Sequence, residues 1–173
     1  KRQEHIYLNG GQSSSATYAT FSDLVDREGA TVSTLTRGEH IPLGDIKIQV
    51  LHPSGLTGDS NEDSLVLQLT CGDVQVLLTG DAGADSESSM LKAGILEDVD
   101  VLKVGHHGSR SSTTQDFLDM VQPEFAIISA GQNSQYGHPH PEVIDRLQRA
   151  AIEVLHTDTS EGDDTLKMVS DCQ

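Results

Sequence analysis

Two apolar segments, each followed by polar residues of the kind that bind metal ions, constrain the fold of this sequence more than any other feature. Residues 74–79 (VQVLLT) precede a Gly-Asp pair that supplies Asp81, and residues 99–104 (VDVLKV) precede a GHHG sequence that supplies His106 and His107. Short apolar runs next to glycine favour buried strands, and sites in α/β layers form at the carboxyl ends of strands. A carboxylate and imidazoles at one sheet edge suit Zn²⁺ or Mn²⁺.

Each of these features also has a plain structural interpretation. A Gly-Asp pair after a strand is often only a turn, and a His pair between glycines fits a surface loop or a helix cap. The flanking glycines would also let the backbone approach a metal or a phosphate closely. Because Asp81 and the His pair follow strands that are expected to be neighbours, the ligand interpretation is favoured for Asp81, His106 and His107.

A third polar cluster, YGHPHPE at 136–142, follows the apolar segment 125–129. One interpretation makes His140 a helix-cap residue and leaves His138 in an exposed turn. The other directs His138 back to the same pocket, as a proton donor or phosphate binder. The residues alone leave both open.

Two smaller groups lie near the expected pocket. Three polar residues precede a strand and serve either as its entry turn or as pocket residues: Asn61, Asp63 and Ser64. Three more form a local patch with basic character beside the His pair: Lys103, Ser109 and Arg110. The other histidines are expected to be ordinary loop or strand-edge residues: His5, His40, His52 and His156.

The remaining pattern predicts a single domain over residues 1–173, with a mixed β-sheet covered on one face by helices. Strands are expected over 5–8, 31–35, 46–51, 64–70, 74–79, 99–104, 125–129, 154–157 and 165–169, and helices over 17–27, 86–93, 114–121 and 141–151. Gly72-Asp73 predicts a hairpin between the strands 64–70 and 74–79. Gly29 and Gly94 are expected to end helices, and Thr113 or Thr114 to cap one.

Charge and cysteine content narrow the function only slightly. The formal net charge is −16, from 27 acidic and 11 basic residues, which repels nucleic acid and anionic membranes unless a local cation intervenes. The acidity fits either solubility or adaptation to high salt. No apolar run reaches the about 18 residues of a membrane span. Cys71 and Cys172 have no paired spacing, so we expect free thiols, with a disulfide as the alternative.

The motifs LLTGD, DVLKVGHHGS, ISAGQNSQYGHPHPEVIDRL and HTD occur in this order. With NEDSLVLQL and VLHPSG before them, they resemble the C-terminal half of the metallo-β-lactamase-like domain of DNA-internalisation competence proteins of the ComEC type. The resemblance covers roughly residues 30–170. It implies an αββα sandwich, and a competence membrane protein would place the domain on the extracytoplasmic face; a soluble or secreted relative is the alternative.

The resemblance also implies a dinuclear site with two divalent ions, Zn or Mn, that cleaves phosphodiesters in DNA with a metal-activated water. Asp81 would bridge the metals, His106 would bind the second metal with His107 as the alternative, and His138 would lie near the substrate phosphate. Asp81 and His138 would be the catalytic residues. The expected substrate-binding residues are Asn61, Ser64, Ser109, Arg110, Tyr136 and His138.

One departure from the family pattern is decisive for activity. The main metal motif, HxHxDH or HxDxDH, does not occur in these 173 residues, and residues 61–64 stand where a further His is expected. The chain is therefore expected to be the C-terminal portion of a domain whose upstream half is its partner, and to be inactive alone, holding at most half of the metal site. The alternatives are a metal-free binding or scaffold domain and a hydrolase of small esters or lactones.

Overall fold

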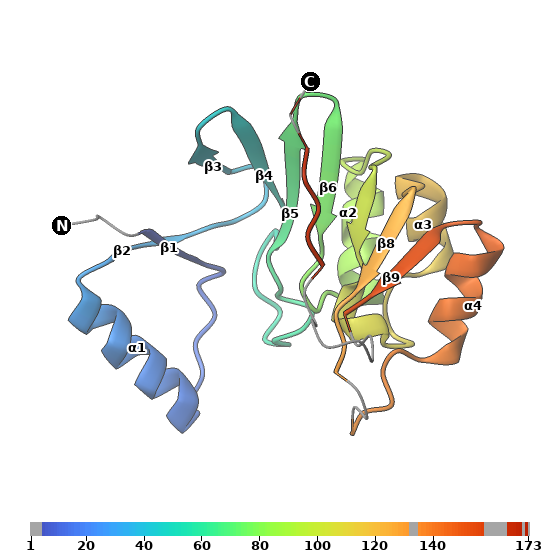
Figure 1. The fold of residues 1–173 in the computed structure, drawn as a ribbon. Helices are drawn as coiled ribbons and strands as arrows, with labels where there is room; N and C mark the ends of the chain where they lie inside the picture. Colours follow the sequence, from blue (N-terminus) through green and yellow to red (C-terminus); the bar gives the residue numbers. More distant parts are fainter. Residues whose placement is uncertain (1–4, 132–134, 158–165, 171, 173) are drawn as a thin grey trace.

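The computed structural model describes residues 5–131, 135–157, 166–170 and 172 (Figure 1). Its elements follow in the order β1 (His5–Leu8), α1 (Ala16–Glu28), β2 (Thr31–Thr34), β3 (His40–Leu43), β4 (Ile46–His52), β5 (Val66–Cys71), β6 (Val74–Leu78), α2 (Ala84–Ala93), β7 (Val101–Lys103), the 3₁₀ helix η1 (Gly105–Gly108), α3 (Gln115–Val121), β8 (Phe125–Ile128), α4 (Pro141–Arg149) and β9 (Glu153–His156).

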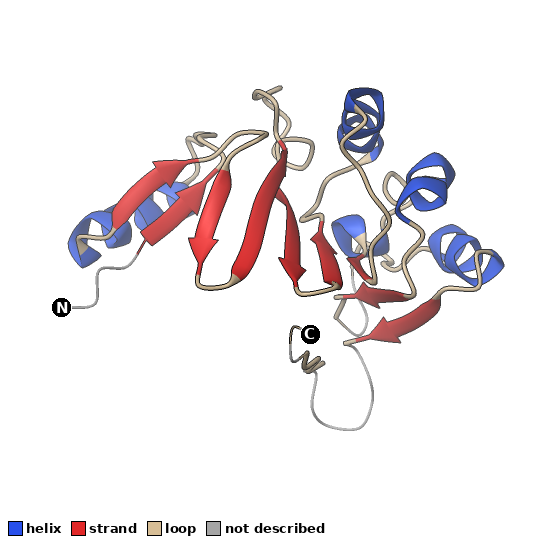
Figure 2. Ribbon diagram, turned by 90° about the horizontal axis from the view of Figure 1, so that it is seen from above, coloured by secondary structure: helices blue, strands red, loops and turns tan. Residues whose placement is uncertain are grey.

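Within the described ranges, β3 to β9 form one seven-stranded mixed sheet in sequence order, and β1 pairs with β2 in a separate parallel pair. The strands from β3 to β6 are antiparallel, and those from β6 to β9 are parallel. Helices α2, α3 and α4 lie on one face of this sheet (Figure 2). The predicted mixed sheet with helices on one face is confirmed, as is the β5–β6 hairpin across Gly72-Asp73.

The core lies between the sheet and these three helices. Leu77, Leu102 and Ile128 of the strands, and Met90 and Phe117 of the helices, are at most 1% exposed. Because side chains alternate along a strand, each strand places every second residue on the helical face. Burying a side chain of this size contributes about 1.5–3 kcal/mol, so this layer holds β6, β7 and β8 in a common frame.

The predicted helix ends agree with the structure at three positions. Gly29 and Gly94 close α1 and α2 with φ of 65° and 63°, a left-handed conformation that favours glycine. Pro141 occupies the first turn of α4, where its missing N–H leaves no bond unmade. Thr114 is the N-cap residue of α3, but its side chain bonds to Glu87 rather than to the helix.

Two strand predictions need correction. Strand β3 was not expected; it contains Pro42 and lies at the sheet edge, where a residue without an N–H is tolerated. The alternating segment expected as a strand over 165–169 contains no strand over residues 166–169, and Thr165 lies outside the described residues. Leu166 and Met168 instead line an apolar groove with sheet residues that include Val76, Val101 and Phe125.

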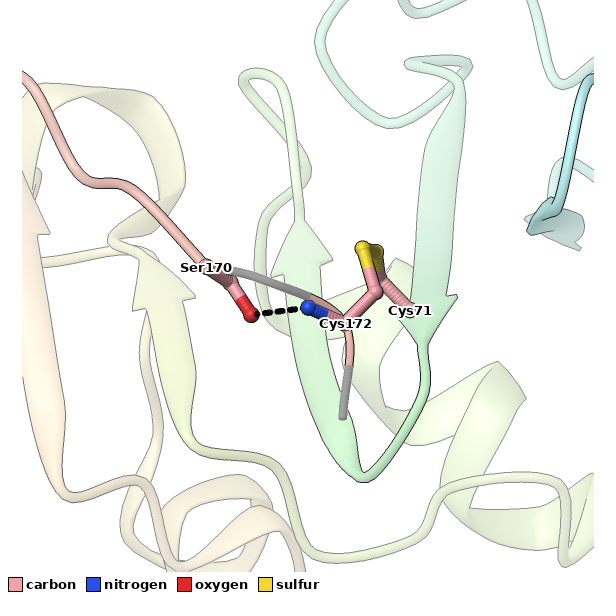
Figure 3. Close-up of a disulfide and its surroundings, with 3 residues drawn as sticks. All are labelled: Cys71, Ser170 and Cys172. Carbon is pink, nitrogen blue, oxygen red and sulfur yellow. Dashed lines mark hydrogen bonds between the residues drawn. A yellow bond between two sulfur atoms is a disulfide. The ribbon is translucent and has the colours of Figure 1, made fainter.

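The expectation of free thiols is wrong. Cys71, at the end of β5, forms a disulfide with Cys172 across 101 residues (Figure 3). The Cys172 N–H donates to Ser170 Oγ at 3.1 Å. The pairing could not be read from spacing, because only the folded sheet brings residues so distant in sequence together.

Candidate metal site

The candidate site lies at the carboxyl ends of three neighbouring parallel strands. Asp81 follows β6, His107 follows β7, and Ser129 follows β8. Because parallel strands end at the same sheet edge, their following loops converge. Asp81 Oδ1 lies 3.4 Å from His107 Nε2, and the two side chains are 39% and 44% exposed. The structure therefore brings this acid and this imidazole together, as expected.

The hydrogen bond made by Nδ1 of His107 determines what Nε2 of the same ring can bind. Nδ1 of His107 lies 2.5 Å from the carbonyl oxygen of Ser129. A carbonyl only accepts, so Nδ1 carries a proton and donates, which leaves Nε2 as the ring nitrogen that faces Asp81 and could bind a metal. A ring held by a carbonyl through one nitrogen, with its other nitrogen open, is the usual arrangement of a metal-binding histidine.

His106 has different surroundings. Its ring centroid lies 5.4 Å from that of His138 and 6.3 Å from that of His107. Both adjacent histidines have left-handed backbones, with φ of 45° at His106 and 57° at His107. Such a conformation costs a non-glycine residue on the order of 1–3 kcal/mol, which the surrounding structure must offset.

The two glycines beside the histidines permit contacts with protein rather than with a ligand. A Cβ at Gly105 would lie 2.9 Å from the carbonyl oxygen of Ala82, next to Asp81. A Cβ at Gly108 would lie 2.6 Å from Pro139 Cβ. The close approach expected here is therefore between the three loops themselves, and it packs them into one unit.

His138 lies beside His106 and His107. Its ring lies 4.9 Å from His140 and 5.9 Å from Tyr136 between centroids, in addition to its contact with His106. Burial lowers the pKa of His138, and the neighbouring His140, His106 and His107 lower it further, while Asp81 opposes them. The lowered pKa favours a neutral imidazole at this position near neutral pH.

Backbone bonds join the His138 loop to the His107 loop. The His140 N–H donates to the carbonyl of Gly108 at 2.9 Å, and the Arg110 N–H donates to His140 Nδ1 at 3.3 Å. His140 is the N-cap residue of α4, as one interpretation expected, whereas His138 is half-buried beside His106 and not in an exposed turn. Its catalytic role stays a prediction.

The turn that carries Asp81 is held by residues from both sides. The Asp81 N–H donates to Ser64 Oγ at 3.1 Å, which places Ser64 against the site. The His106 N–H and Lys103 Nζ both donate to the carbonyl of Gly80, at 3.1 and 2.8 Å. Burial lowers the pKa of Lys103, and Asp81 opposes that effect. Lys103 was expected in a basic surface patch, but it is half-buried and supports the Asp81 turn.

The other expected pocket residues lie in less direct positions. The hydroxyl of Ser109 is paired with that of Ser111 at 3.0 Å, and Ser109 is only 7% exposed. Arg110 is exposed beside the His138 loop, and Asn61 is half-buried in the turn before β5. The structure thus places Ser64 and His138 at the site, whereas the substrate-binding roles of all these residues remain predictions.

His52 was expected to be an ordinary loop or strand-edge residue; it lies at a strand end, but it is buried. It ends β4, is 4% exposed, and its Nε2 lies 2.7 Å from the carbonyl oxygen of Glu62. Burial lowers the pKa of His52, and Arg37 lowers it further. His52 therefore stays neutral and donates from Nε2, tying β4 to the turn before β5.

The donors fit part of a transition-metal site. No group of three or more His, Cys, Asp or Glu side chains in the described part of the chain is arranged to hold a metal ion. Asp81 and His107 offer one oxygen and one nitrogen at a common point, whereas a structural or catalytic zinc needs three or four donors. These residues alone thus fit part of the predicted centre.

The fold and this edge define the class. The chain belongs to the metallo-β-lactamase superfamily, whose family model matches residues 8–132. It is similar to CmlA, a diiron β-hydroxylase from Streptomyces venezuelae, with a TM-score of 0.52 and 14% identity over 78% of this chain and 35% of that chain. That likeness bears on the fold alone.

Two curated relatives extend the comparison. The chain is 42% identical over 132 residues to ComE operon protein 3 of Bacillus subtilis (strain 168), covering 76% of this chain and 17% of that protein. It is 37% identical over 117 residues to competence protein ComA of Neisseria gonorrhoeae, covering 66% of this chain and 17% of that protein. The predicted resemblance to competence proteins is confirmed. The chain spans less than a fifth of the length of either relative. No helix in the ranges the structure describes is long and apolar enough to cross a bilayer.

Proposed function

We propose that this chain is the C-terminal part of a metal-dependent hydrolase domain that cleaves phosphodiesters of DNA during DNA uptake. The observation that supports it most directly is the pair formed by Asp81 and His107, in which Ser129 leaves Nε2 of the imidazole open toward the carboxylate. Membership of the metallo-β-lactamase superfamily supports the hydrolase class. The names of the relatives support the link to competence.

In this proposal Asp81 and His107 hold divalent ions, Zn or Mn, and His107 takes the ligand role first expected of His106. A bound divalent ion lowers the pKa of water and offsets negative charge on a leaving oxygen. His138, with its lowered pKa, is suited to move a proton beside the substrate. Bound divalent ions would also let DNA approach a chain whose formal net charge is −16.

The remaining donors are proposed to come from an upstream half of the domain, in which we expect the HxHxDH or HxDxDH motif. The relatives are much longer than this chain, which accommodates such a segment. The disulfide supports an extracytoplasmic location, because disulfides persist in oxidising compartments.

The test uses a protein extended upstream by about eighty residues, the length that completes a typical domain. Asp81→Ala is expected to lower the bound Mn²⁺ and Zn²⁺, measured by mass spectrometry of the metal, and to abolish cleavage of a labelled DNA. The matched control is Asp98→Ala, which removes an exposed acid in the loop before β7. Cleavage retained in Asp81→Ala would contradict the assignment, as would equal loss in both variants.

His138→Ala separates the two proposed roles at the site. It is expected to slow cleavage about a hundredfold, the contribution typical of a proton-transferring residue, with less effect on metal content. Metal loss as large as that of Asp81→Ala would make His138 a ligand instead.

A further inference from the structure

A buried carboxylate that belongs to none of the motifs holds the base of the His106–His107 loop. Glu87, on α2, is 2% exposed. Its carboxylate accepts from the Thr113 N–H at 2.5 Å, from the Thr114 N–H at 2.8 Å and from Thr114 Oγ1 at 2.7 Å. These two residues end the loop that begins at Gly105, so one side chain of α2 fixes the returning end of that loop.

Thr113 needs such support. Its φ is 54°, in the left-handed region that a β-branched residue rarely adopts. Its Oγ1 is buried and has no hydrogen-bond partner among the described residues. With His106 and His107, it makes three non-glycine residues of positive φ in one short loop. A loop with this conformation persists only where bonds from outside over-determine it.

A second group holds the same segment from the other side. Arg146, on α4, donates from Nη1 to the carbonyl of Ser112 at 3.2 Å and to that of Thr113. The Ser112 hydroxyl donates in turn to the carbonyl of Gly105 at 2.7 Å. The acid of α2 and the base of α4 are thereby linked to the residue directly before His106.

We propose that Glu87 and Arg146 are positioning residues, which act through Ser112, Thr113 and Thr114 to hold His107 against Asp81 in its metal-binding orientation. The inference rests on the proposed function for the role of His107, but its structural content does not need a metal. A carboxylate accepting from two backbone N–H groups is a strong, directional support. Mutation of a residue that orients a metal ligand without touching the metal typically lowers metal affinity by about tenfold to a hundredfold.

The first measurement uses the 173-residue chain without metal. Nitrogen-15 NMR of the His107 ring reports its tautomer, and hydrogen exchange reports the Thr113 and Thr114 amides. In Glu87→Gln, which cannot accept at both oxygens, the Nδ1–H tautomer of His107 is expected to become mixed. Exchange at Thr113 is expected to rise at least tenfold, while the core amide of Leu102 keeps its rate. The control is Asp85→Asn, an exposed position of the same helix.

Arg146→Lys tests the same loop should Glu87→Gln fail to fold. It keeps the charge but loses the planar donor geometry, and it should shift the same signals; Arg149→Lys, exposed on the same helix, is its control. A general loss of stability with an unchanged His107 tautomer would overturn the proposal.

The second measurement separates this inference from the proposed function. In the upstream-extended protein, Glu87→Gln is expected to weaken Mn²⁺ binding about tenfold, measured by calorimetry. If the upstream-extended parent binds no Mn²⁺ but the His107 signals still change in Glu87→Gln, the positioning role stands. The same result would contradict the metal-dependent function. Wild-type Mn²⁺ affinity in both Glu87→Gln and Arg146→Lys would remove the positioning role.

Discussion

Two acidic residues in the two halves of the seven-stranded sheet, Asp63 and Asp81, have opposite surroundings. Asp63, before the antiparallel strand β5, is 4% exposed and accepts from the Thr57 N–H at 2.7 Å, Thr57 Oγ1 at 2.8 Å and the Gly58 N–H at 2.9 Å. Asp81, after β6, is 39% exposed and faces His107. The carboxylate of Asp63 accepts hydrogen bonds from its own loop, whereas the carboxylate of Asp81 is partly exposed and could bind a metal or a ligand.

The strand directions explain this difference. In the antiparallel half, from β3 to β5, consecutive strands end at opposite edges, so a polar residue at one end meets mainly its own connection. In the parallel half, from β6 to β9, the carboxyl ends share one edge, where loops distant in sequence meet. For these two acids, the carboxylate before β5 serves the structure of its own loop, and the carboxylate at the shared edge of the parallel half faces the site.

The largest expected effect is on the disulfide that ties the antiparallel half to the C-terminal segment. Reduction of Cys71–Cys172 is expected to lower the free energy of unfolding by about 4 kcal/mol, because it frees a loop of about a hundred residues in the unfolded chain. Urea denaturation with and without reductant measures the change. The His107 ring signals should stay the same in the reduced folded protein; a change in them would mean that the halves are coupled.

The two acids themselves give the sharpest contrast. Asp63→Ala is expected to destabilise the protein by about 3 kcal/mol, because it leaves three donors without their acceptor in a buried turn. Asp81→Ala is expected to change stability by less than about 0.5 kcal/mol, as for an exposed position. Urea denaturation of both variants without metal tests the difference, and equal destabilisation would break the comparison.

Two glycines of positive φ extend the test to the loops. Gly108→Ala, at φ 81°, is expected to cost about 2–3 kcal/mol, because strain adds to a contact between the new Cβ and Pro139. Gly38→Ala, at φ 93° in a turn of the antiparallel half, has open space around it and should cost about 1 kcal/mol. Thermal unfolding of both variants measures the difference, and a milder effect at Gly108 would mean that the site loops are not closely packed.

The smallest expected effect concerns pH. Burial lowers the pKa of His52 below its ordinary 6.5, with Arg37 adding to the effect. As pH falls through 6.5, the unfolded chain takes up a proton before the folded chain does, so stability decreases with falling pH. The loss is expected to begin near pH 6.5 and to grow as the pH falls toward the lowered pKa of the folded state. His52→Gln should abolish this part of the pH dependence in urea denaturation, and the exposed His40→Gln should not.

Much of the parallel half could be predicted because its signals are local. Apolar runs bounded by glycine gave β6, β7 and β8, and parallel ends at one edge predicted that Asp81 and the His pair would converge. That His107, rather than His106, faces Asp81 could not be predicted, because its ring orientation depends on the Ser129 carbonyl, 22 residues away. Glu87 could not be found either, since its partners lie 26 and 27 residues further along the chain.

The sequence by itself determined most of the strands and helices, the order in which they alternate, and the acid and imidazoles that follow parallel strands, since each depends on neighbours within a few residues. Only the tertiary structure decided which imidazole nitrogen faces Asp81, whether the two cysteines pair, and which charged side chains hold the loop. Those outcomes depend on bonds between elements that are distant in sequence. The physical reason is that the role of a polar group depends on the hydrogen-bond donor or acceptor that folding places beside it. The sequence pattern alone does not show which group that will be.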